Sequence, residues 1–339
     1  MSDQKTMRSW TVQSDGGRTI VELHDAPMPA PGPGQLLIRV GAASLNRGEF
    51  IAAHGLNKPG VAKAAGMEAA GEVIGVGSGI NGGINGGVDT FKVGARVFGR
   101  CGGAFSAFAL MDAREAMAMP EHLSIEEAAA VPITFMTVHD MLIAQGRLSA
   151  GEWLLVTGIS SGVGVAALQT AKALGAKVIG TSGSAEKLKK LIALGLDVAL
   201  QTRAADFCDA VMKATDNRGI ELVVNNVGGS VFAECVRSLA FEGRLATVGY
   251  VDGVLEAKID IEALHAKRLT LFGVSNKLRT PAQKLAAARR FAAELLPIIV
   301  ARGIRPAIDR VFSFDDLVAA KAHMESNAHL GKIVLRGSA

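Results

Sequence analysis

A glycine-rich segment of the sequence has the residue types that bind a phosphate through the main chain. It reads Thr157-Gly-Ile-Ser-Ser-Gly-Val-Gly164 and stands between an apolar run and a segment with helical character. Glycines permit a sharp turn and a close approach of the backbone to a pyrophosphate, and the first N–H groups of a helix stabilise its negative charge. The spacing departs from the strict GxGxxG pattern, so a purely structural turn is the alternative. The strand before it and the helix after it favour a dinucleotide site.

The segment after the next apolar run indicates which dinucleotide would bind. An NAD site has an Asp or Glu about 20 residues beyond the glycine turn, where it binds the ribose 2′-hydroxyl. Here residues 180–187 contain no carboxylate before Glu186, which already belongs to the next predicted helix. We therefore expect a seat for the 2′-phosphate of NADPH, in preference to NADH, formed by Ser182, Gly183, Ser184 and Lys187. A solvated helix residue is the alternative for Lys187, and Arg203 is a weaker supporting charge.

These segments follow the first two of six apolar runs, which alternate with segments of helical character. The runs lack polar alternation, as is typical of strands covered on both faces. Such alternation predicts an α/β domain with a doubly wound, six-stranded parallel sheet. The strands are expected at 153–156, 177–180, 198–200, 221–224, 244–248 and 269–272. The helices are expected at 162–175, 185–194, 204–216, 230–240 and 260–267.

The first 125 residues differ from this α/β segment. Short apolar strands, expected at 35–41, 68–77 and 95–98, are separated by Gly, Pro and Asn, which predicts a mostly β domain. A Gly-rich loop at 80–87 repeats Ile-Asn-Gly-Gly, and we expect a flexible surface insertion there. Residues 124–127 have the spacing of a capping box that opens a helix.

A second helix is expected to begin at Pro132, where the missing N–H is harmless. The tail predicts a long helix at 281–302, a second helix near 315–325 and a final strand at 332–336. Because this tail follows the sixth strand of the parallel sheet, we expect it to return to the N-terminal domain.

Composition excludes several classes of protein. A length of 339 residues predicts about two domains, and the formal charge of +4 is spread without a long basic run. Aromatic residues make up 5% of the chain, which argues against nucleic-acid binding by stacked rings. The three cysteines are far apart and form no CxxC pair, so neither a disulfide framework nor a structural zinc site is expected. With no apolar run of about 18 residues and no secretory signal at the start, we expect a cytoplasmic protein without a membrane partner.

Further motifs occur in chain order along the sequence. They are Ala43-Ser-Leu-Asn-Arg-Gly-Glu49, Gly66-Met-Glu-Ala-Ala-Gly-Glu-Val-Ile-Gly-Val-Gly77, Phe91-Lys-Val-Gly-Ala-Arg-Val97, Ala130-Val-Pro-Ile-Thr-Phe-Met-Thr-Val138 and Gly331-Lys-Ile-Val334. Together they resemble the medium-chain dehydrogenase/reductase superfamily, in particular its zinc-independent quinone oxidoreductase branch. The resemblance implies a Rossmann NADPH-binding domain at 129–275, inserted into a GroES-like catalytic domain made of 1–128 and 276–339. It also implies a homodimer.

The resemblance bears on metal binding as well. Zinc-dependent members of the superfamily hold a catalytic zinc with a Cys, a Gly-His-Glu and a further Cys or Asp, whereas this sequence has Asn46 and Met67 at the first two positions. An amide and a thioether do not replace a thiolate and an imidazole on zinc, so no metal site is expected. Without a metal, reduction of an electron-poor acceptor demands less of the protein than oxidation of an alcohol. We expect hydride to pass from NADPH to a quinone or an α,β-unsaturated carbonyl.

Roles for individual residues follow from the same resemblance. It puts Asn46 beside the nicotinamide, where the amide would hold the carboxamide or a substrate oxygen; a turn or helix-cap Asn is the alternative. The other residues that it places around the dinucleotide are Thr137, Ser161, Gly162, Val163, Asn226, Val248, Gly249, Phe272 and Val274.

Tyr250 is the only tyrosine and follows the fifth strand of the parallel sheet. Its phenol could donate a proton to a developing enolate, and an aromatic ring packed at a domain edge is the alternative. Two other functions remain open for the whole chain. One is an enoyl-thioester reductase, and the other is a sensor protein that binds NADPH without turnover.

Overall fold

A computed structural model describes residues 5–15, 17–51, 60–79 and 91–337, and the predicted Gly-rich loop at 80–87 lies outside them. The chain forms two compact units. Unit 1 consists of Met1–Met136 and Arg279–Ala339, and unit 2 of Thr137–Leu278. The sequence analysis placed these boundaries at 128/129 and 275/276. The first boundary falls later, and within the added segment the N–H of Ile133 donates to the buried carboxylate of Glu68.

Unit 2 is a doubly wound α/β domain, as expected from the sequence. Its six strands pair in the order β11-β10-β9-β12-β13-β14, and every pairing is parallel. The strands are β9 (Trp153–Thr157), β10 (Lys177–Thr181), β11 (Val198–Leu200), β12 (Ile220–Asn225), β13 (Leu239–Thr247) and β14 (Thr270–Gly273). The central strand β9 is buried along its whole length, which explains why its sequence is apolar without alternation.

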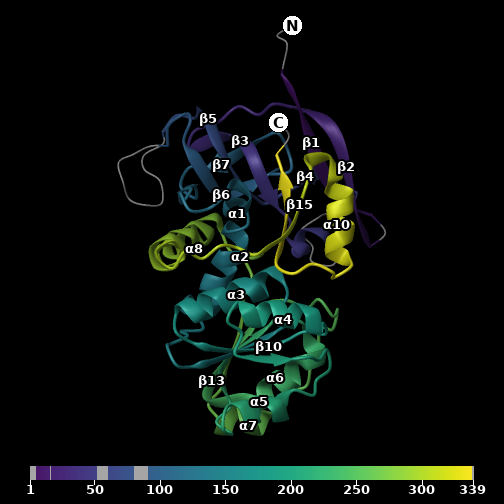
Figure 1. The fold of residues 1–339 in the computed structure, drawn as a ribbon. Helices are drawn as coiled ribbons and strands as arrows, with labels where there is room; N and C mark the ends of the chain where they lie inside the picture. Colours follow the sequence, from purple (N-terminus) through teal and green to yellow (C-terminus); the bar gives the residue numbers. More distant parts are fainter. Residues whose placement is uncertain (1–4, 16, 52–59, 80–90, 338–339) are drawn as a thin grey trace. The chain divides into compact units, whose positions relative to one another are not determined.

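Helices cover both faces of this sheet. In Figure 1, α3 and α4 lie on one side of the strands and α5 and α6 on the other, as right-handed crossovers require. The helical elements of unit 2 are a π-helix η3 (His139–Ala144), α3 (Gly162–Ala173), α4 (Ala185–Ala193), α5 (Cys208–Ala214), a 3₁₀ turn η4 (Gly229–Val231), α6 (Phe232–Arg237) and α7 (Ile261–Ala266). Each helix expected from the sequence is present, with ends that shift by a few residues.

Unit 1 is built mainly from antiparallel strands. A three-stranded sheet has the order β2-β1-β4, and a larger sheet has the order β15-β16-β3-β5-β6-β7, with a further pairing between β3 and β7 that closes part of it into a barrel. The strands are β1 (Thr6–Asp15), β2 (Arg18–Pro27), β3 (Gln35–Ser44), β4 (Lys63–Ala64), β5 (Glu68–Val76), β6 (Arg96–Gly102), β7 (Phe108–Asp112), β8 (Met117–Ala118), β15 (Ile308–Phe312) and β16 (Lys332–Arg336).

The tail returns to unit 1, because β16 pairs antiparallel with β3. The helical elements of this unit are η1 (Arg47–Phe50), α1 (Ile125–Ala129), the start of α2 (Pro132–Val138), α8 (Pro281–Glu294), α9 (Leu296–Ala301), η5 (Phe314–Asp316) and α10 (Leu317–Glu325). The predicted capping box is present: Ser124 caps α1 and accepts from the N–H of Glu127, whose side chain accepts from the N–H of Ser124. No helix in the described ranges combines the length and apolarity that a membrane span needs.

Two features of unit 1 differ from the sequence prediction. The single helix expected at 281–302 is two helices, because Pro297 has no N–H to continue the ladder and the chain breaks at Leu295. The hairpin of β1 and β2 was not predicted, although its strands are rich in β-branched residues. Trp10 and Val12, on one face of β1, pack in the core of unit 1, whereas β2 is largely exposed.

Close packing at the start of α3 gives a test of the fold. A Cβ added to Gly164 would lie 2.5 Å from the carbonyl oxygen of Ile159, whereas a Cβ on Gly273 would meet nothing within 4 Å. We expect Gly164→Ala to destabilise unit 2 by about 1–3 kcal/mol, the usual effect of overpacking, and Gly273→Ala to change its stability by less than about 0.5 kcal/mol. The midpoints of thermal unfolding measure both, and equal midpoints for the two variants would contradict this packing.

Candidate functional site

The turn between β9 and α3 has the geometry of a phosphate-binding loop. Gly158 has a φ of +62°, which few residues other than glycine adopt easily. Ser161 caps α3, and its hydroxyl accepts from the N–H of Gly164 at 3.1 Å. Ser161, Gly162 and Val163 are each partly exposed, so the positive end of the helix is accessible to an anion.

Ile159 stands where the strict motif has a glycine, and the structure shows what compensates. Its side chain is fully buried and lies over Gly180 of the neighbouring strand, where an added Cβ would collide with Ile159 Cδ1. The position where close packing requires a glycine is therefore Gly180 in β10, and position 159 can hold an isoleucine. The sequence analysis did not single out Gly180, because the two residues are not neighbours in the sequence.

Most of the predicted dinucleotide residues meet at the carboxyl edge of the sheet. Hydrogen bonds join the segments that follow neighbouring strands: Ile159 N–H donates to Thr181 O at 3.0 Å, Val248 N–H to Asn225 O at 3.0 Å, and Val274 N–H to Thr247 O at 2.9 Å. The residues gathered at this edge are Ser161, Gly162, Val163, Ser182, Gly183, Ser184, Asn226, Val248, Gly249, Phe272 and Val274. This edge is where ligands bind in open parallel sheets.

Two buried asparagines hold the centre of that edge. Asn225 Oδ1 accepts from Thr157 Oγ1 and from the N–H groups of Val227 and Gly228, and its Nδ2 donates to Gly228 O. Asn226 Nδ2 donates to Thr157 O at 3.1 Å. An aspartate at 225 could not make the donor contact to Gly228 O, so this position needs an amide.

The segment after β10, which the sequence predicts as the seat of a 2′-phosphate, contains two serine hydroxyls, and a guanidinium lies over it. Ser184 caps α4 and accepts from the N–H of Lys187, and Ser182 Oγ accepts from the N–H of Ser184. A Cβ on Gly183 would collide with Arg203 Nε, so the Arg203 side chain lies directly over this glycine. Arg203, which the sequence predicts only as a weaker supporting charge, therefore contacts the predicted seat directly.

The loop that contains Tyr250 is tied to the same edge by a different residue. Asp252 accepts from Ser230 Oγ at 2.6 Å and from the N–H groups of Ser230 and Val254, and these hydrogen bonds help to hold the pKa of its carboxyl below the usual value against the effect of burial. A Cβ on Gly228 would collide with the Asp252 carboxylate. Tyr250 itself is 38% exposed, and its role as a proton donor stays a prediction.

Unit 1 places Asn46 in a buried polar cluster. Asn46 Nδ2 donates to Glu68 Oε1 at 2.7 Å, and Asn46 Oδ1 accepts from Lys332 Nζ at 2.9 Å. Lys332 and Glu68 form an ion pair at 3.1 Å, with side chains 7% and 0% exposed. Glu68 also accepts from Ser44 Oγ and, through Oε2, from the N–H of Ile133 at 2.6 Å. Neither oxygen of this buried carboxylate is therefore left without a hydrogen-bond donor.

A second buried carboxyl lies close to this cluster. Glu49 accepts from the N–H of Gly66, yet burial raises the pKa of Glu49 to about 7. Burial, together with the negative charges of Glu68 and Glu49, also raises the pKa of the Cys101 thiol to about 12, so this thiol has no thiolate character at neutral pH. From the sequence alone, Cys101 is expected to be a small buried apolar residue and Glu49 a candidate ion-pair partner of Arg47. The structure buries both residues, and the Arg47 guanidinium donates to Met324 O and Asn327 Oδ1.

The donors at the position of a catalytic zinc do not suit that metal. Within the described part of the chain, no three His, Cys, Asp or Glu side chains converge as metal ligands. The oxygen of Asn46 faces the ammonium of Lys332 at 2.9 Å, so a cation at this oxygen would be repelled. Met67 offers only a thioether, a poor ligand for zinc.

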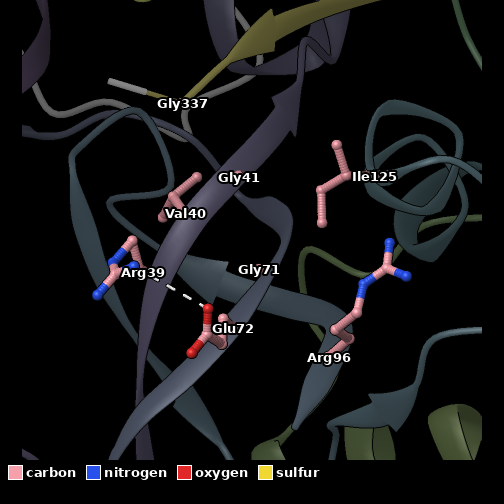
Figure 2. A pocket seen from close by; sticks show the side chains of 8 residues that line it. All are labelled: Arg39, Val40, Gly41, Gly71, Glu72, Arg96, Ile125 and Gly337. Carbon is pink, nitrogen blue, oxygen red and sulfur yellow. Dashed lines mark ion pairs between the residues drawn. The ribbon is translucent and has the colours of Figure 1, made fainter. Parts of the chain in front are cut away.

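A separate cavity of about 310 Å³ lies in unit 1. Figure 2 shows the residues that line it. Its charged side chains are Arg96 and the ion pair of Arg39 with Glu72, whose closest atoms are 4.0 Å apart. None of the residues predicted for the site lines this cavity.

Thr137 lies in α2, which precedes the strands of the parallel sheet in the sequence. Its role at the dinucleotide also stays a prediction.

Known proteins match this chain in both units. Residues 162–292 match the family described as zinc-binding dehydrogenase, and residues 32–121 match the alcohol dehydrogenase GroES-like domain. Quinone oxidoreductase from Rattus norvegicus is 29% identical over 98% of this chain and 98% of its own length. The solved structure of mycobacterial Rv1454c complexed with NADPH has a TM-score of 0.85 at 28% identity and covers 97% of this chain and 99% of its own.

A larger protein also contains a matching segment. A subunit of the phenolphthiocerol/phthiocerol polyketide synthase from Mycobacterium tuberculosis is 30% identical over 96% of this chain. The chain spans only 14% of the length of that protein.

The raised pKa of Glu49 predicts a pH dependence of stability. Because the folded pKa, about 7, lies above the usual 4.5, the folded state binds more protons between these values, and stability falls as pH rises through them. Between pH 5 and pH 8, we expect the free energy of unfolding of wild type to fall by about 3 kcal/mol more than that of Glu49→Gln, at about 1.4 kcal/mol per pKa unit. Urea unfolding at both pH values measures it. Glu121→Gln, at an exposed carboxylate, is the control, and parallel profiles for wild type and Glu49→Gln would exclude the shift.

Proposed function

The chain belongs to the medium-chain dehydrogenase/reductase superfamily, in its quinone oxidoreductase branch, and we propose that it reduces a quinone or an α,β-unsaturated carbonyl with NADPH and without zinc. That it is an oxidoreductase follows from the family. The finer assignment rests on one observation above all: the seat after β10 combines Lys187, Arg203 and two serines with no carboxylate at the ribose position. A 2′-phosphate fits this seat, whereas a 2′-hydroxyl lacks the acid that would bind it.

The residues of unit 2 bind and orient the dinucleotide in this proposal. The N-terminus of α3 at Ser161–Val163 binds the pyrophosphate, since its first N–H groups and helix dipole favour an anion. The hydrogen-bonded ends of β12 and β13, held by Asn225, position Val248 and Gly249 for the nicotinamide ribose. NADPH supplies the hydride when it is bound, and the similar Rv1454c was solved in complex with NADPH.

In unit 1, Asn46 is proposed to contact the oxygen of the acceptor. A quinone or an enone gains negative charge on oxygen as hydride arrives at carbon, and an N–H donor stabilises that charge. The residue types in this region support a reaction without a metal. Asn46 and Met67 stand where zinc-dependent members have the Cys and His ligands, and Lys332 supplies a positive charge beside Asn46. The proton that completes the reaction comes from Tyr250 or from solvent.

Other expectations from the sequence stay predictions. The homodimer is one of them, and β14 is an edge strand of the parallel sheet that a second copy of the chain could extend. The cytoplasmic location is another.

An enoyl-thioester reductase is the second candidate. The polyketide synthase relative supports it, although the chain covers a small part of that protein. A sensor that binds NADPH without turnover is the third candidate. The substrates rather than the fold separate these functions, since one fold serves all of them.

A panel of acceptors tests the proposal directly. We expect NADPH oxidation with benzoquinones, naphthoquinones, enals or enones, and turnover that survives exhaustive chelation. The readout is loss of absorbance of the reduced nicotinamide with each acceptor. Turnover of a crotonyl thioester alone would support the second candidate, and tight NADPH binding without turnover on the whole panel would support the sensor. Inactivation by chelators that zinc reverses would overturn the metal-free reaction.

Cofactor preference tests the seat after β10. Lys187→Ala and Arg203→Gln are each expected to raise the KM for NADPH about 10- to 100-fold, because each removes a charge-assisted contact of about 1.5–3 kcal/mol. The KM for NADH should stay unchanged, since that cofactor lacks the 2′-phosphate. Lys190→Ala is the matched control, because Lys190 lies on the same helix and pairs with Glu186 at 3.0 Å. An unchanged NADPH/NADH preference in both variants would refute the seat.

A further inference from the structure

Asn46, Glu68 and Lys332 form a closed ring of hydrogen bonds. Lys332 Nζ donates to Asn46 Oδ1 at 2.9 Å and to Glu68 Oε1 at 3.1 Å, and Asn46 Nδ2 donates to the same Glu68 oxygen at 2.7 Å. The third ammonium hydrogen of Lys332 goes to Leu45 O at 2.9 Å. Each polar end of the Asn46 amide therefore faces a buried group of opposite charge.

This arrangement selects one of the two orientations of the amide. Rotation by 180° about the last side-chain bond would put the NH₂ group against the ammonium and the oxygen against the carboxylate. Both contacts would then be repulsive at less than 3 Å, in a region where charges are weakly screened. Amide orientation is ambiguous for many asparagines, but here the charges decide it.

The consequence is a donor with a fixed direction. An amide nitrogen has two hydrogens, and Glu68 takes one of them. The other hydrogen is available to a ligand at the partly exposed Asn46 side chain. The ammonium on Oδ1 also polarises the amide and strengthens its N–H groups as donors.

We propose that Lys332 and Glu68 are positioning residues that hold Asn46 as a hydrogen-bond donor to the acceptor oxygen. The inference rests on the proposed function and adds the direction of the contact and the residues that set it. It distinguishes two roles that the sequence left open for Asn46, since an amide can serve as donor or acceptor. Oxygen-bearing acceptors, which gain negative charge during reduction, are the substrate class that a fixed donor selects.

Glu68 and Lys332 also link separate segments of unit 1, so a loss of activity alone does not establish positioning. A double-mutant cycle separates the roles. Asn46→Ala is expected to lower kcat about 100-fold, as removal of an oxyanion donor does. Lys332→Met is expected to lower kcat at least 10-fold in wild type but less than about 3-fold in the Asn46→Ala background. The KM for NADPH should change little in each variant. Equal factors in both backgrounds would show a merely structural role and overturn the inference.

Two further variants keep the test decisive if Lys332→Met fails to fold. Asn46→Asp has the same shape but no N–H, so it should lose at least as much activity as Asn46→Ala; retained activity would mean that Asn46 accepts, which overturns the inference. Ser44→Ala removes a different donor to Glu68 and should lower the unfolding midpoint with kcat within about 3-fold of wild type. If wild type turns over no acceptor, the proposed function fails and the inference fails with it; turnover with independent effects refutes the inference alone.

Discussion

A carboxylate buried away from water must be surrounded by donors, and Glu68 imposes this constraint on unit 1. It is fully buried, and its partners are Ser44, Asn46, Ile133 and Lys332, which come from separate parts of the chain. Breaking such a pair by removing one partner typically costs several kcal/mol, because the remaining charge stays buried. The C-terminal tail, which pairs with β3 through β16, supplies this ammonium. The same lysine contacts Asn46, so the returning tail also bears on the orientation of that amide.

In unit 2, neutral side chains make the hydrogen bonds that buried polar atoms need. The ends of its central strands contain buried backbone polar atoms, and Thr157, Asn225 and Asn226 satisfy them through one connected set of hydrogen bonds. Buried networks are stable only when every member is satisfied, and they then hold their surroundings rigidly. This rigidity lets the glycine turn and the loop after β13 keep the positions that binding of a dinucleotide requires. Asp252 extends the same restraint to the loop that carries Tyr250.

The polar groups that could contact a ligand differ in charge between the two units. Unit 2 offers N–H groups and cations to phosphates, and unit 1 offers a neutral donor backed by an ammonium. The ammonium is that of Lys332, which bonds Asn46 Oδ1 and is itself paired with the buried Glu68. In the proposed reaction the acceptor is already electron-poor, and the Asn46 N–H would stabilise the negative charge that develops on its oxygen.

The sequence by itself determined the strands and helices of the parallel sheet and the place of the phosphate turn, because strands covered on both faces must be apolar and tight turns need glycine. It also indicated the missing acid after β10, since that position is defined by local spacing. The break at Leu295 was equally local, in Pro297, but a strong helical pattern on both sides concealed it.

Only the tertiary structure decided the contacts between residues that are far apart in the chain. Arg203 lies over Gly183, Ile159 lies over Gly180, and Lys332 reaches Glu68 across 264 positions. A contact between distant residues leaves no period or spacing in one sequence, because either residue alone has an ordinary local role. The charge of a buried side chain is determined in the same way. Glu49 and Glu68 are the same residue type in neighbouring motifs. Burial raises the pKa of Glu49 to about 7, whereas Glu68 is held in a salt bridge with Lys332, and this difference comes only from their surroundings.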